Sequence, residues 1–293
     1  MKRKLAAGIS LSIALFCAIQ AIGAADANKK IILVAHRGGV VDKDHSENSL
    51  KAMEEAIRRG YTHVEVDARC TKDGRVVCFH ENNMKSEAGI DAKVSDLTLD
   101  EVKKIVLTRS KEHIPTFDEY CSRCKGRIHL MVDIKGVDDL WLEPYARQID
   151  EALQRHGLIE NTLFIINQFP VGNQEKVVAW FLGRAKLSWR ASLLRTRILQ
   201  PYVPDPAKYN FVFNSPADFS KEEIDGFHAL GLKIIASVNV DHYRGRPVDP
   251  IQQGLEDIKK MLDWGVDGLQ IDSCYDPLVF ERLGKQESVR IPR

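Results

Sequence analysis

Acidic and basic side chains stand close together at the ends of several apolar runs of the sequence. These side chains are His36, Glu65, Asp67, Asp133 and Lys135. Successive residues of a strand point to opposite faces, so Glu65 and Asp67 share a face, as do Asp133 and Lys135. Three carboxylates that converge would repel one another unless a cation lay among them. Their hard oxygen atoms favour magnesium, calcium or manganese over zinc.

A second histidine, His80, is expected to lie close to these carboxylates. The pair Asp73-Gly74 stands between two β runs, and an Asp-Gly pair in this position predicts a two-residue hairpin turn. In that register His80 lies opposite Asp67, about 5 Å away at the β-carbon. Because histidine titrates near neutral pH, His36 and His80 suit acid–base chemistry.

The charges around this predicted centre indicate the kind of substrate. Arg37 follows His36 directly, and Lys135 follows Asp133 by two residues. A divalent metal beside two histidines, an arginine and a lysine suits an anionic, oxygen-rich group such as a phosphate ester. These residues therefore predict an anionic substrate such as a phosphate ester; the family resemblance described below implies a small-molecule phosphodiester.

The elements that must position these residues alternate along the chain. Strands are expected at residues 31–35, 62–68, 75–80, 128–134, 162–167, 187–191, 210–213, 232–238 and 268–271. Helices are expected at residues 49–59, 140–156, 174–183, 221–230 and 255–264, where apolar residues recur at intervals of three and four. The strands are apolar on both faces, as in parallel sheets covered by helices.

The number of strands decides the fold class. Setting aside the return strand of the hairpin leaves eight strands, the number that closes a (β/α)₈ barrel. We therefore predict a single TIM barrel with an extra β-hairpin strand after strand 2. The active site of such a barrel lies at the carboxyl ends of the strands, where the polar residues stand. No linker or repeat divides the chain.

The first residues are expected to lie outside this fold. Lys2, Arg3 and Lys4 precede an almost uninterrupted apolar stretch, which small residues follow. This pattern is typical of a secretory signal peptide, here residues 1–24, and leaves the barrel domain at residues 25–293. The alternative is a retained membrane anchor, although the stretch is barely long enough to span a bilayer. We expect a periplasmic or secreted protein without stable membrane association after cleavage.

Bulk charge and cysteine content add further expectations. The chain has 42 basic and 41 acidic residues and no basic run, which disfavours nucleic acid as a partner. Cys121 and Cys124 fall in a helical pattern, so they are expected to be apolar helix positions or one local disulfide rather than a zinc site. The two-residue hairpin register places Cys70 and Cys78 on opposite faces, which argues against a disulfide between them. Nothing in the sequence predicts an oligomeric state.

The sequence resembles the glycerophosphodiester phosphodiesterase family, and the resemblance covers nearly the whole chain after the apolar stretch. The family's signature blocks have counterparts in the same order in His36-Arg37-Gly38, Glu47-Asn48-Ser49, Glu65-Val66-Asp67, Thr71-Lys72-Asp73-Gly74 and His80-Glu81. Later matches are Ile114-Pro115-Thr116-Phe117, Asp133-Ile134-Lys135, Val238-Asn239 and Gly265-Val266-Asp267-Gly268. Members of this family are TIM barrels that hydrolyse glycerophosphodiesters to glycerol 3-phosphate and an alcohol.

The resemblance implies a role for each matched residue. Glu65, Asp67 and Asp133 match ligands of one divalent cation, calcium or magnesium. His36 and His80 match the acid–base pair, in which one histidine deprotonates the attacking oxygen and the other protonates the leaving alcohol.

The remaining matches concern the phosphate and the residues around it. Arg37 and Lys135 would hold the phosphoryl oxygens. Glu47 would orient Arg37 or His36, and Asn48 is a candidate N-cap of the following helix.

Two departures from the family pattern concern the metal ion and the choice of substrate respectively. Asp133 stands in place of the usual glutamate, and Ala236 stands where a tryptophan commonly lies over the substrate. The chain's four tryptophans are expected in the core. Two other functions were weighed: a phospholipase-D-like phosphodiesterase acting on intact phospholipids, and a non-catalytic barrel that binds phosphorylated head groups. The charged segment 81–113 disfavours the first, and the complete set of histidines and carboxylates disfavours the second.

Overall fold

The computed structural model describes residues 31–167 and 172–283. Residues from Ile32 onward belong to one compact unit. The expected signal peptide, residues 1–24, lies outside the described residues. No helix among the described residues is both long enough and apolar enough to cross a membrane.

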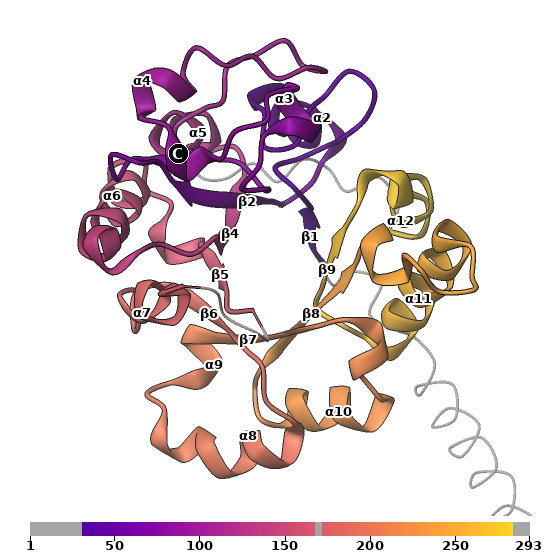
Figure 1. The fold of residues 1–293 in the computed structure, drawn as a ribbon. Helices are drawn as coiled ribbons and strands as arrows, with labels where there is room; N and C mark the ends of the chain where they lie inside the picture. Colours follow the sequence, from indigo (N-terminus) through magenta and orange to yellow (C-terminus); the bar gives the residue numbers. More distant parts are fainter. Residues whose placement is uncertain (1–30, 168–171, 284–293) are drawn as a thin grey trace, which may run out of the picture. The chain divides into compact units, whose positions relative to one another are not determined.

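Eight parallel strands form a closed barrel (Figure 1). They are β1 (Ile32–Ala35), β2 (His63–Cys70), β4 (His129–Ile134), β5 (Leu163–Ile165), β6 (Lys186–Trp189), β7 (Asn210–Asn214), β8 (Lys233–Val238) and β9 (Gly268–Ile271). Strand β1 pairs with both β9 and β2, which closes the ring. A ninth strand, β3 (Val76–Cys78), runs antiparallel to β2 outside the ring. The predicted barrel with one extra hairpin strand is confirmed.

The helices cover the outside of the barrel (Figure 1). They are α2 (Leu50–Arg59), α3 (Lys85–Ala88), α4 (Leu99–Val102), α5 (Phe117–Cys124), α6 (Leu142–Arg155), α7 (Gln174–Ala179), α8 (Leu193–Leu199), α9 (Pro206–Tyr209), α10 (Lys221–Ala229), α11 (Pro250–Trp264) and α12 (Asp276–Leu283). All nine expected strands and all five expected helices have counterparts, with ends shifted by a few residues.

Local sequence signals fix where the helices begin and end. The Ser49 hydroxyl accepts a hydrogen bond from Ala52 N at the start of α2, which satisfies one of the free amides of the first turn. Gly60 ends the same helix with φ 93°, a left-handed conformation that glycine adopts without steric cost. Thr116 and Glu119 form a capping box at the start of α5.

Below the mouth, the barrel interior is filled mainly by apolar side chains. Alternate residues of the strands meet there in one buried cluster of Val34, Met131, Leu163, Ile165, Phe211, Phe213 and Ile235. The side chains of the predicted site residues on these strands also point inward, one or two residues nearer the carboxyl ends of the strands. The apolar cluster therefore acts as a floor beneath the polar mouth.

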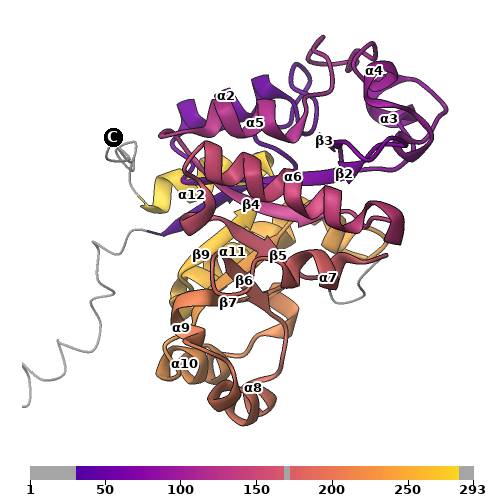
Figure 2. The ribbon, with the colours of Figure 1, turned by 90° about the vertical axis from the view of Figure 1, so that its left-hand side faces the viewer.

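A small lobe lies beyond the carboxyl end of β2. It comprises residues 81–113 with α3 and α4 (Figure 2). Its own apolar cluster includes Met84, Val94 and Leu107, which pack with Val77 and Phe79 of the hairpin. The lobe is thus attached to the barrel through the hairpin strand.

The hairpin register differs from the prediction by one residue. Thr71 N donates to Arg75 O, so Lys72, Asp73 and Gly74 form a three-residue loop rather than a two-residue turn. Ala68 pairs with Cys78, and Phe79 N donates to Asp67 O. Phe79, not His80, therefore lies opposite Asp67.

The shifted register also changes the predicted faces of two cysteines. Because Ala68 pairs with Cys78 and Cys70 pairs with Val76, Cys70 and Cys78 share a face. The predicted opposite faces are wrong, although both cysteines are free. Cys121 and Cys124 are also free and buried in α5, in agreement with the reading as apolar helix positions.

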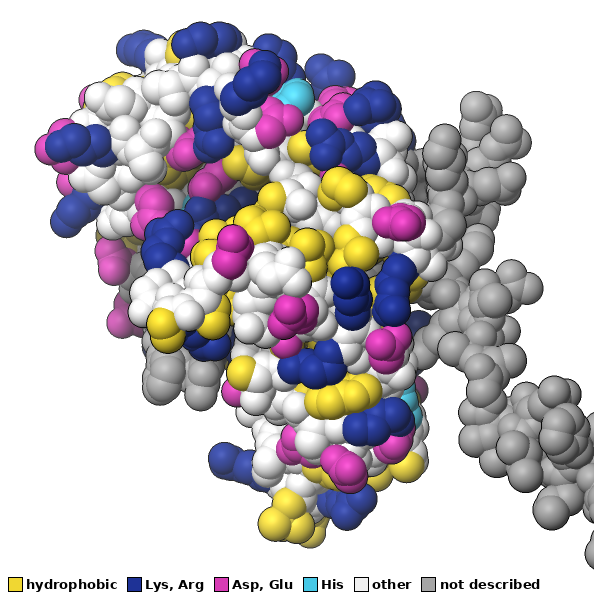
Figure 3. All heavy atoms as spheres, turned by 90° about the vertical axis from the view of Figure 1, so that its right-hand side faces the viewer, with side chains coloured by type: hydrophobic (Ala, Val, Ile, Leu, Met, Phe, Trp, Pro, Cys, Tyr) yellow, Lys and Arg dark blue, Asp and Glu magenta, His cyan; other side chains and the backbone are white. Residues whose placement is uncertain are grey.

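Basic and acidic side chains are interspersed on the face that Figure 3 shows.

Candidate active site

Three carboxylates meet at the carboxyl ends of β2 and β4. Glu65, Asp67 and Asp133 are all buried, and one oxygen atom from each lies within 4.8 Å of the others. Asp67 pairs directly with Asp133 across the two parallel strands. The spacing of Glu65 and Asp67 on one strand face thus brings the predicted acidic residues together.

Lys135 supplies a positive charge to this cluster. Its Nζ lies 2.7 Å from Asp133 Oδ2 and 2.8 Å from Asp67 Oδ1. Burial alone would lower the pKa of Lys135, but Asp67 and Asp133 raise it well above its ordinary value. Lys135 therefore stays protonated and offsets part of the negative charge.

The carboxylates respond to this environment in opposite directions. Burial raises the pKa of Glu65, and the charges of Asp67 and Asp133 raise it further. Burial would also raise the pKa of Asp67, but Lys135 and His80 hold it below its ordinary value. Asp67 is thus ionised beside Lys135, whereas Glu65 ionises only at a higher pH.

Both candidate histidines contact a carboxylate through Nδ1. His36 Nδ1 lies 2.7 Å from Asp272 Oδ1, and His80 Nδ1 lies 3.0 Å from Glu81 Oε1. When the proton is on Nδ1, the Nδ1–H donates a hydrogen bond to the carboxylate, and Nε2 of the same ring is free to act as a base. Asp272 is held in turn by Val240 N, which donates to Oδ2 at 2.7 Å.

Arg37 lies in a tight loop after β1. Its backbone N donates to Glu65 Oε2 at 2.6 Å, and its guanidinium contacts Glu47 at 2.6 Å and Asp241 at 2.5 Å. Glu47 was expected to orient either Arg37 or His36, and in the structure it contacts Arg37. Arg37 has φ 54°, an uncommon backbone conformation for a residue with a β-carbon.

Gly38 and Gly39 allow this loop to pack closely on α2. A β-carbon on Gly38 would lie 2.4 Å from Asn48 Cα, and one on Gly39 would lie 2.2 Å from Ala52 O. Both contacts are far too short for a real side chain. The two glycines are therefore required where the loop bearing His36 crosses the start of α2.

The predicted capping role of Asn48 is wrong. Ser49 caps α2, while the Asn48 side chain donates to Asp67 Oδ2 at 2.7 Å and accepts from Asp67 N at 3.0 Å. Asn48 thus fixes the orientation of one of the three carboxylates.

The donor set fits a hard divalent cation. Arg37 N donates to Glu65 Oε2, and the Asn48 amide donates to Asp67 Oδ2. Among the described residues, the buried Asp67 Oδ1 accepts no hydrogen bond and has the Lys135 ammonium 2.8 Å away. Carboxylate oxygens are the ligands that calcium and magnesium prefer. Glu65, Asp67 and Asp133 could therefore hold such an ion.

The structure adds residues that sequence reasoning did not assign to the site. Asn167 and Gln174 lie 3.3 and 3.4 Å from Asp133 Oδ1. Arg190 follows β6, and its buried Nε has no hydrogen-bond partner among the residues that the structure describes. Asp272 directly follows β9, the last barrel strand, which pairs with β1. An acidic residue at the end of the last predicted strand could therefore have identified Asp272 as a site residue from the sequence.

Ala236 does not belong to the mouth. It is fully buried and alternates with Ile235, which lies in the interior cluster. The side chain of position 236 therefore points toward the helices. The expectation that a tryptophan at position 236 would lie over the substrate is not supported by this backbone.

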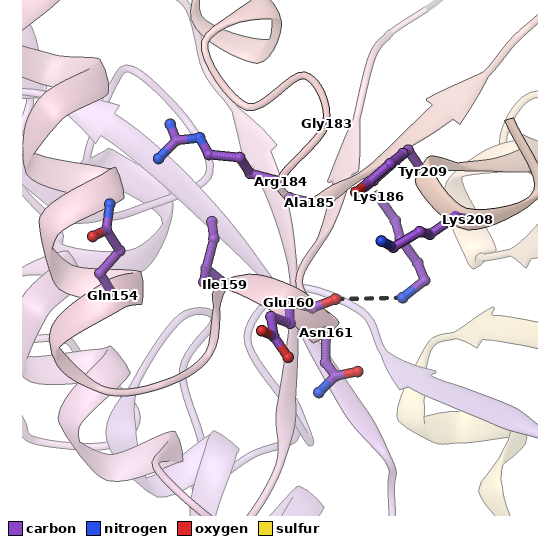
Figure 4. A pocket seen from close by; sticks show the side chains of 10 residues that line it. All are labelled: Gln154, Ile159, Glu160, Asn161, Gly183, Arg184, Ala185, Lys186, Lys208 and Tyr209. Atoms are coloured by element: carbon purple, nitrogen blue, oxygen red, sulfur yellow. Dashed lines mark hydrogen bonds between the residues drawn. The ribbon is translucent and has the colours of Figure 1, made fainter. Parts of the chain in front are cut away.

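Two cavities are lined by residues that contact the carboxylates. One of about 230 Å³ is lined by His36, Arg37 and Asp272, and another of about 470 Å³ is lined by Lys135 and the loop after β4. A cavity of about 660 Å³ lies elsewhere, mostly at the amino ends of β5, β6 and β7 (Figure 4). Lys186 Nζ donates to Glu160 O in that cavity, far along the strands from the predicted site residues.

Comparisons with known proteins point to one family. The model of the Glycerophosphoryl diester phosphodiesterase family matches residues 36–156. The chain is 34% identical over 251 residues to a glycerophosphodiester phosphodiesterase of Caldanaerobacter subterraneus subsp. tengcongensis, covering 83% of this chain and 94% of that protein. The fold is similar, with a TM-score of 0.63 and 18% identity, to an Oleispira antarctica phosphodiesterase solved with sn-glycerol-3-phosphate, covering 87% of this chain and 96% of that chain.

The mammalian relatives match over a shorter stretch. The mouse protein, glycerophosphodiester phosphodiesterase 1, is 31% identical over 120 residues, covering 38% of this chain and 36% of the mouse protein. The chain therefore spans little more than a third of the length of the mammalian relatives it matches.

Proposed function

The chain belongs to the glycerophosphoryl diester phosphodiesterase family, and we propose that it hydrolyses glycerophosphodiesters to glycerol 3-phosphate and an alcohol with one divalent cation, calcium or magnesium. The buried group of Glu65, Asp67 and Asp133 carries the proposal. His36, paired with Asp272, stands at the end of the neighbouring strand. The relatives' names and the product bound to the Oleispira antarctica protein support the same substrate class.

The charged side chains would hold the substrate's phosphate. The guanidinium of Arg37 and the ammonium of Lys135 would neutralise the phosphoryl oxygens, whose negative charge grows in the transition state. Glu47 and Asp241 hold Arg37 in place. A cation on Glu65, Asp67 and Asp133 would supply further Lewis-acid stabilisation of the same oxygens.

The two histidines would move the protons. One histidine takes a proton from the attacking oxygen, which is water or the substrate's own 2-hydroxyl. The other gives a proton to the alcohol as its bond to phosphorus breaks. Asp272 and Glu81 each accept a hydrogen bond from Nδ1–H of their histidine. Nε2 of the neutral histidine can then take the proton of the attacking oxygen, while Nε2–H of the other histidine, as imidazolium, gives its proton to the leaving alcohol.

The function is tested with a panel of glycerophosphocholine, glycerophosphoethanolamine, glycerophosphoinositol and phosphatidylglycerol. We expect hydrolysis of the first three, complete loss with chelator, and recovery on adding calcium or magnesium. Hydrolysis of phosphatidylglycerol alone would instead identify an enzyme acting on intact lipids. Binding of these compounds without turnover would identify a non-catalytic barrel.

Glu65→Gln is expected to shift the metal activation curve to at least about tenfold higher metal concentration, because it removes a charged ligand from a three-carboxylate site. Metal activation curves measured for both proteins check this. Glu151→Gln, on the outside of α6, is the matched control and should leave the curve unchanged. An unchanged curve for Glu65→Gln would remove this residue from the metal site.

Asp272→Asn is expected to lower kcat by about ten- to a hundredfold. Asparagine retains an acceptor for Val240 N but removes the carboxylate that lies 2.7 Å from His36 Nδ1. The melting temperature should stay close to the wild-type value, because asparagine has nearly the same shape as aspartate. A lower kcat that comes with a clearly lower melting temperature would indicate a purely structural role.

Export is proposed on the pattern of residues 1–24 alone. We place the mature protein in the periplasm or outside the cell. Amino-terminal sequencing of the protein recovered from its host tests this, and recovery of an intact Met1 terminus would contradict it.

A further inference from the structure

We propose that the cavity of about 470 Å³ beside Lys135 binds the alcohol half of the substrate and favours an alcohol that carries an anionic group. This proposal rests on the proposed function, because it assigns one of the two ester arms of the substrate to this cavity. The cavity is named the outer cavity below. It is bounded by the end of β2, the loop after β4 and the small lobe.

The position of the outer cavity links it to the reacting phosphate. Lys135 lines its inner end, and the same ammonium contacts Asp67 and Asp133. A phosphorus atom held by these groups would thus place one ester oxygen at the entrance of the outer cavity. The separate cavity of about 230 Å³ beside His36 remains for the other ester arm.

Two cationic side chains give the outer cavity its charge. The Arg69 guanidinium donates only to main-chain oxygens, at Phe79 and His80, and no described carboxylate forms an ion pair with it. Lys72 is exposed, and its side chain forms no ion pair or hydrogen bond with the residues that the structure describes. Both positive charges are therefore available to a ligand.

The acidic side chain that lines the outer cavity is Asp138. Lys135 is already balanced by Asp67 and Asp133. Among the residues that line the outer cavity, Arg69 and Lys72 thus face one carboxylate, while Glu81 and Glu101 interact with them from outside the lining. The balance favours an incoming carboxylate or phosphate, and Asp138 leaves a place for an ammonium group on the same alcohol.

The walls of the outer cavity suit a small polar alcohol. Asn82 and Ser95 offer amide and hydroxyl groups, which can bind hydroxyls of the ligand. The half-buried indole of Trp141 forms another wall. It packs so closely on Gly74 that a β-carbon there would lie 2.3 Å from the ring. Trp141 thus lies at a ligand cavity, contrary to its expected place in the core.

A matched pair of substrates isolates the proposed anion preference. Glycerophosphoserine differs from glycerophosphoethanolamine by one carboxylate on the alcohol. We expect the wild-type protein to show a higher kcat/KM for glycerophosphoserine. The ratio of the two kcat/KM values is the quantity to follow, because a general loss of activity cancels in it.

Removal of the cations should lower that ratio. Lys72→Gln is expected to lower the ratio roughly threefold and Arg69→Gln roughly tenfold. The larger effect is expected for Arg69 because its guanidinium is less exposed to solvent than the Lys72 ammonium. Damage to His80 through its carbonyl bond to Arg69 would lower both kcat/KM values together and leave the ratio unchanged. Lys259→Gln, an exposed change on α11, is the matched control and should leave both values unchanged.

The outcomes separate the subsite from the function itself. A wild-type ratio near one, or a ratio unchanged in both Lys72→Gln and Arg69→Gln, would overturn the subsite while hydrolysis stands. If neither substrate is hydrolysed with calcium or magnesium, the proposed function fails. Calorimetric titration of both compounds into chelator-treated protein then decides the subsite. Tighter binding of glycerophosphoserine that Lys72→Gln weakens supports it, and equal or absent binding overturns it.

Discussion

Replacing His36 by alanine is expected to lower kcat by about a hundred- to ten-thousandfold. The imidazole is the group that Asp272 orients at the end of β1, and alanine can neither take nor give a proton. The variant should still bind the divalent cation, because the carboxylates are on β2 and β4. Steady-state hydrolysis and metal titration of the same preparation check both expectations.

His113→Ala is the matched control for this experiment. His113 is exposed on the small lobe, so its loss should leave kcat within about twofold of wild type. Hydrolysis by His36→Ala at the rate of the control would exclude His36 from proton transfer. His80→Ala serves as the partner measurement, and activity retained there would exclude the second histidine in the same way.

Acidification is expected to destabilise the fold through His63, at the amino end of β2. His63 is buried in the barrel, and its ring centroid lies 5.1 Å from that of His129. Burial lowers the pKa of His63 to about 3, and His129, Lys186 and Lys233 contribute to the shift. The unfolded chain, with a pKa of 6.5 at this residue, binds the proton more readily.

The direction of the effect follows from proton linkage. Between pH 6.5 and pH 3 the unfolded chain holds a proton on His63 that the folded chain lacks, so the free energy of unfolding falls as the pH falls. The loss from this residue should reach about 2 kcal/mol at pH 5 and about 4 to 5 kcal/mol near pH 3. Above pH 6.5 this contribution is constant.

Urea unfolding of wild type and His63→Gln at pH 7.5 and pH 5 measures the effect. Glutamine is neutral throughout, so the difference between the two proteins should change by about 2 kcal/mol between these pH values. His113→Gln is the matched control, because its exposed ring should give no such change. A pH-independent difference between wild type and His63→Gln would show that His63 titrates normally in the fold.

The fold was predictable because its signals are local. Each barrel strand is a short apolar run, and the last one, Gly268–Ile271, has the predicted bounds. The hairpin register was not predictable from the Asp-Gly pair alone. The Thr71 hydroxyl contacts Asp73 Oδ1 at 2.6 Å and accepts from Arg75 N at 2.9 Å. These side-chain contacts stabilise a three-residue loop where a two-residue turn was expected.

The site was predictable where one strand carries several of its residues. Glu65 and Asp67 share a face by simple alternation, and β2 places them beside Asp133. Contacts between distant segments were not predictable in this way. Asp272 reaches His36 only because the last barrel strand closes on the first. Trp141 reaches the outer cavity only because the hairpin loop at Gly74 packs on it.

The ammonium of Lys135 between Asp67 and Asp133 has a consequence for how the protein matures. A cluster of buried carboxylates without a counter-ion would oppose folding until metal arrived. Here the chain carries its own counter-ion, so the barrel can close before any metal is captured. With the divalent cation proposed above, folding and metal loading would then be separate events. A newly made molecule would reach its folded state even in a compartment poor in divalent ions.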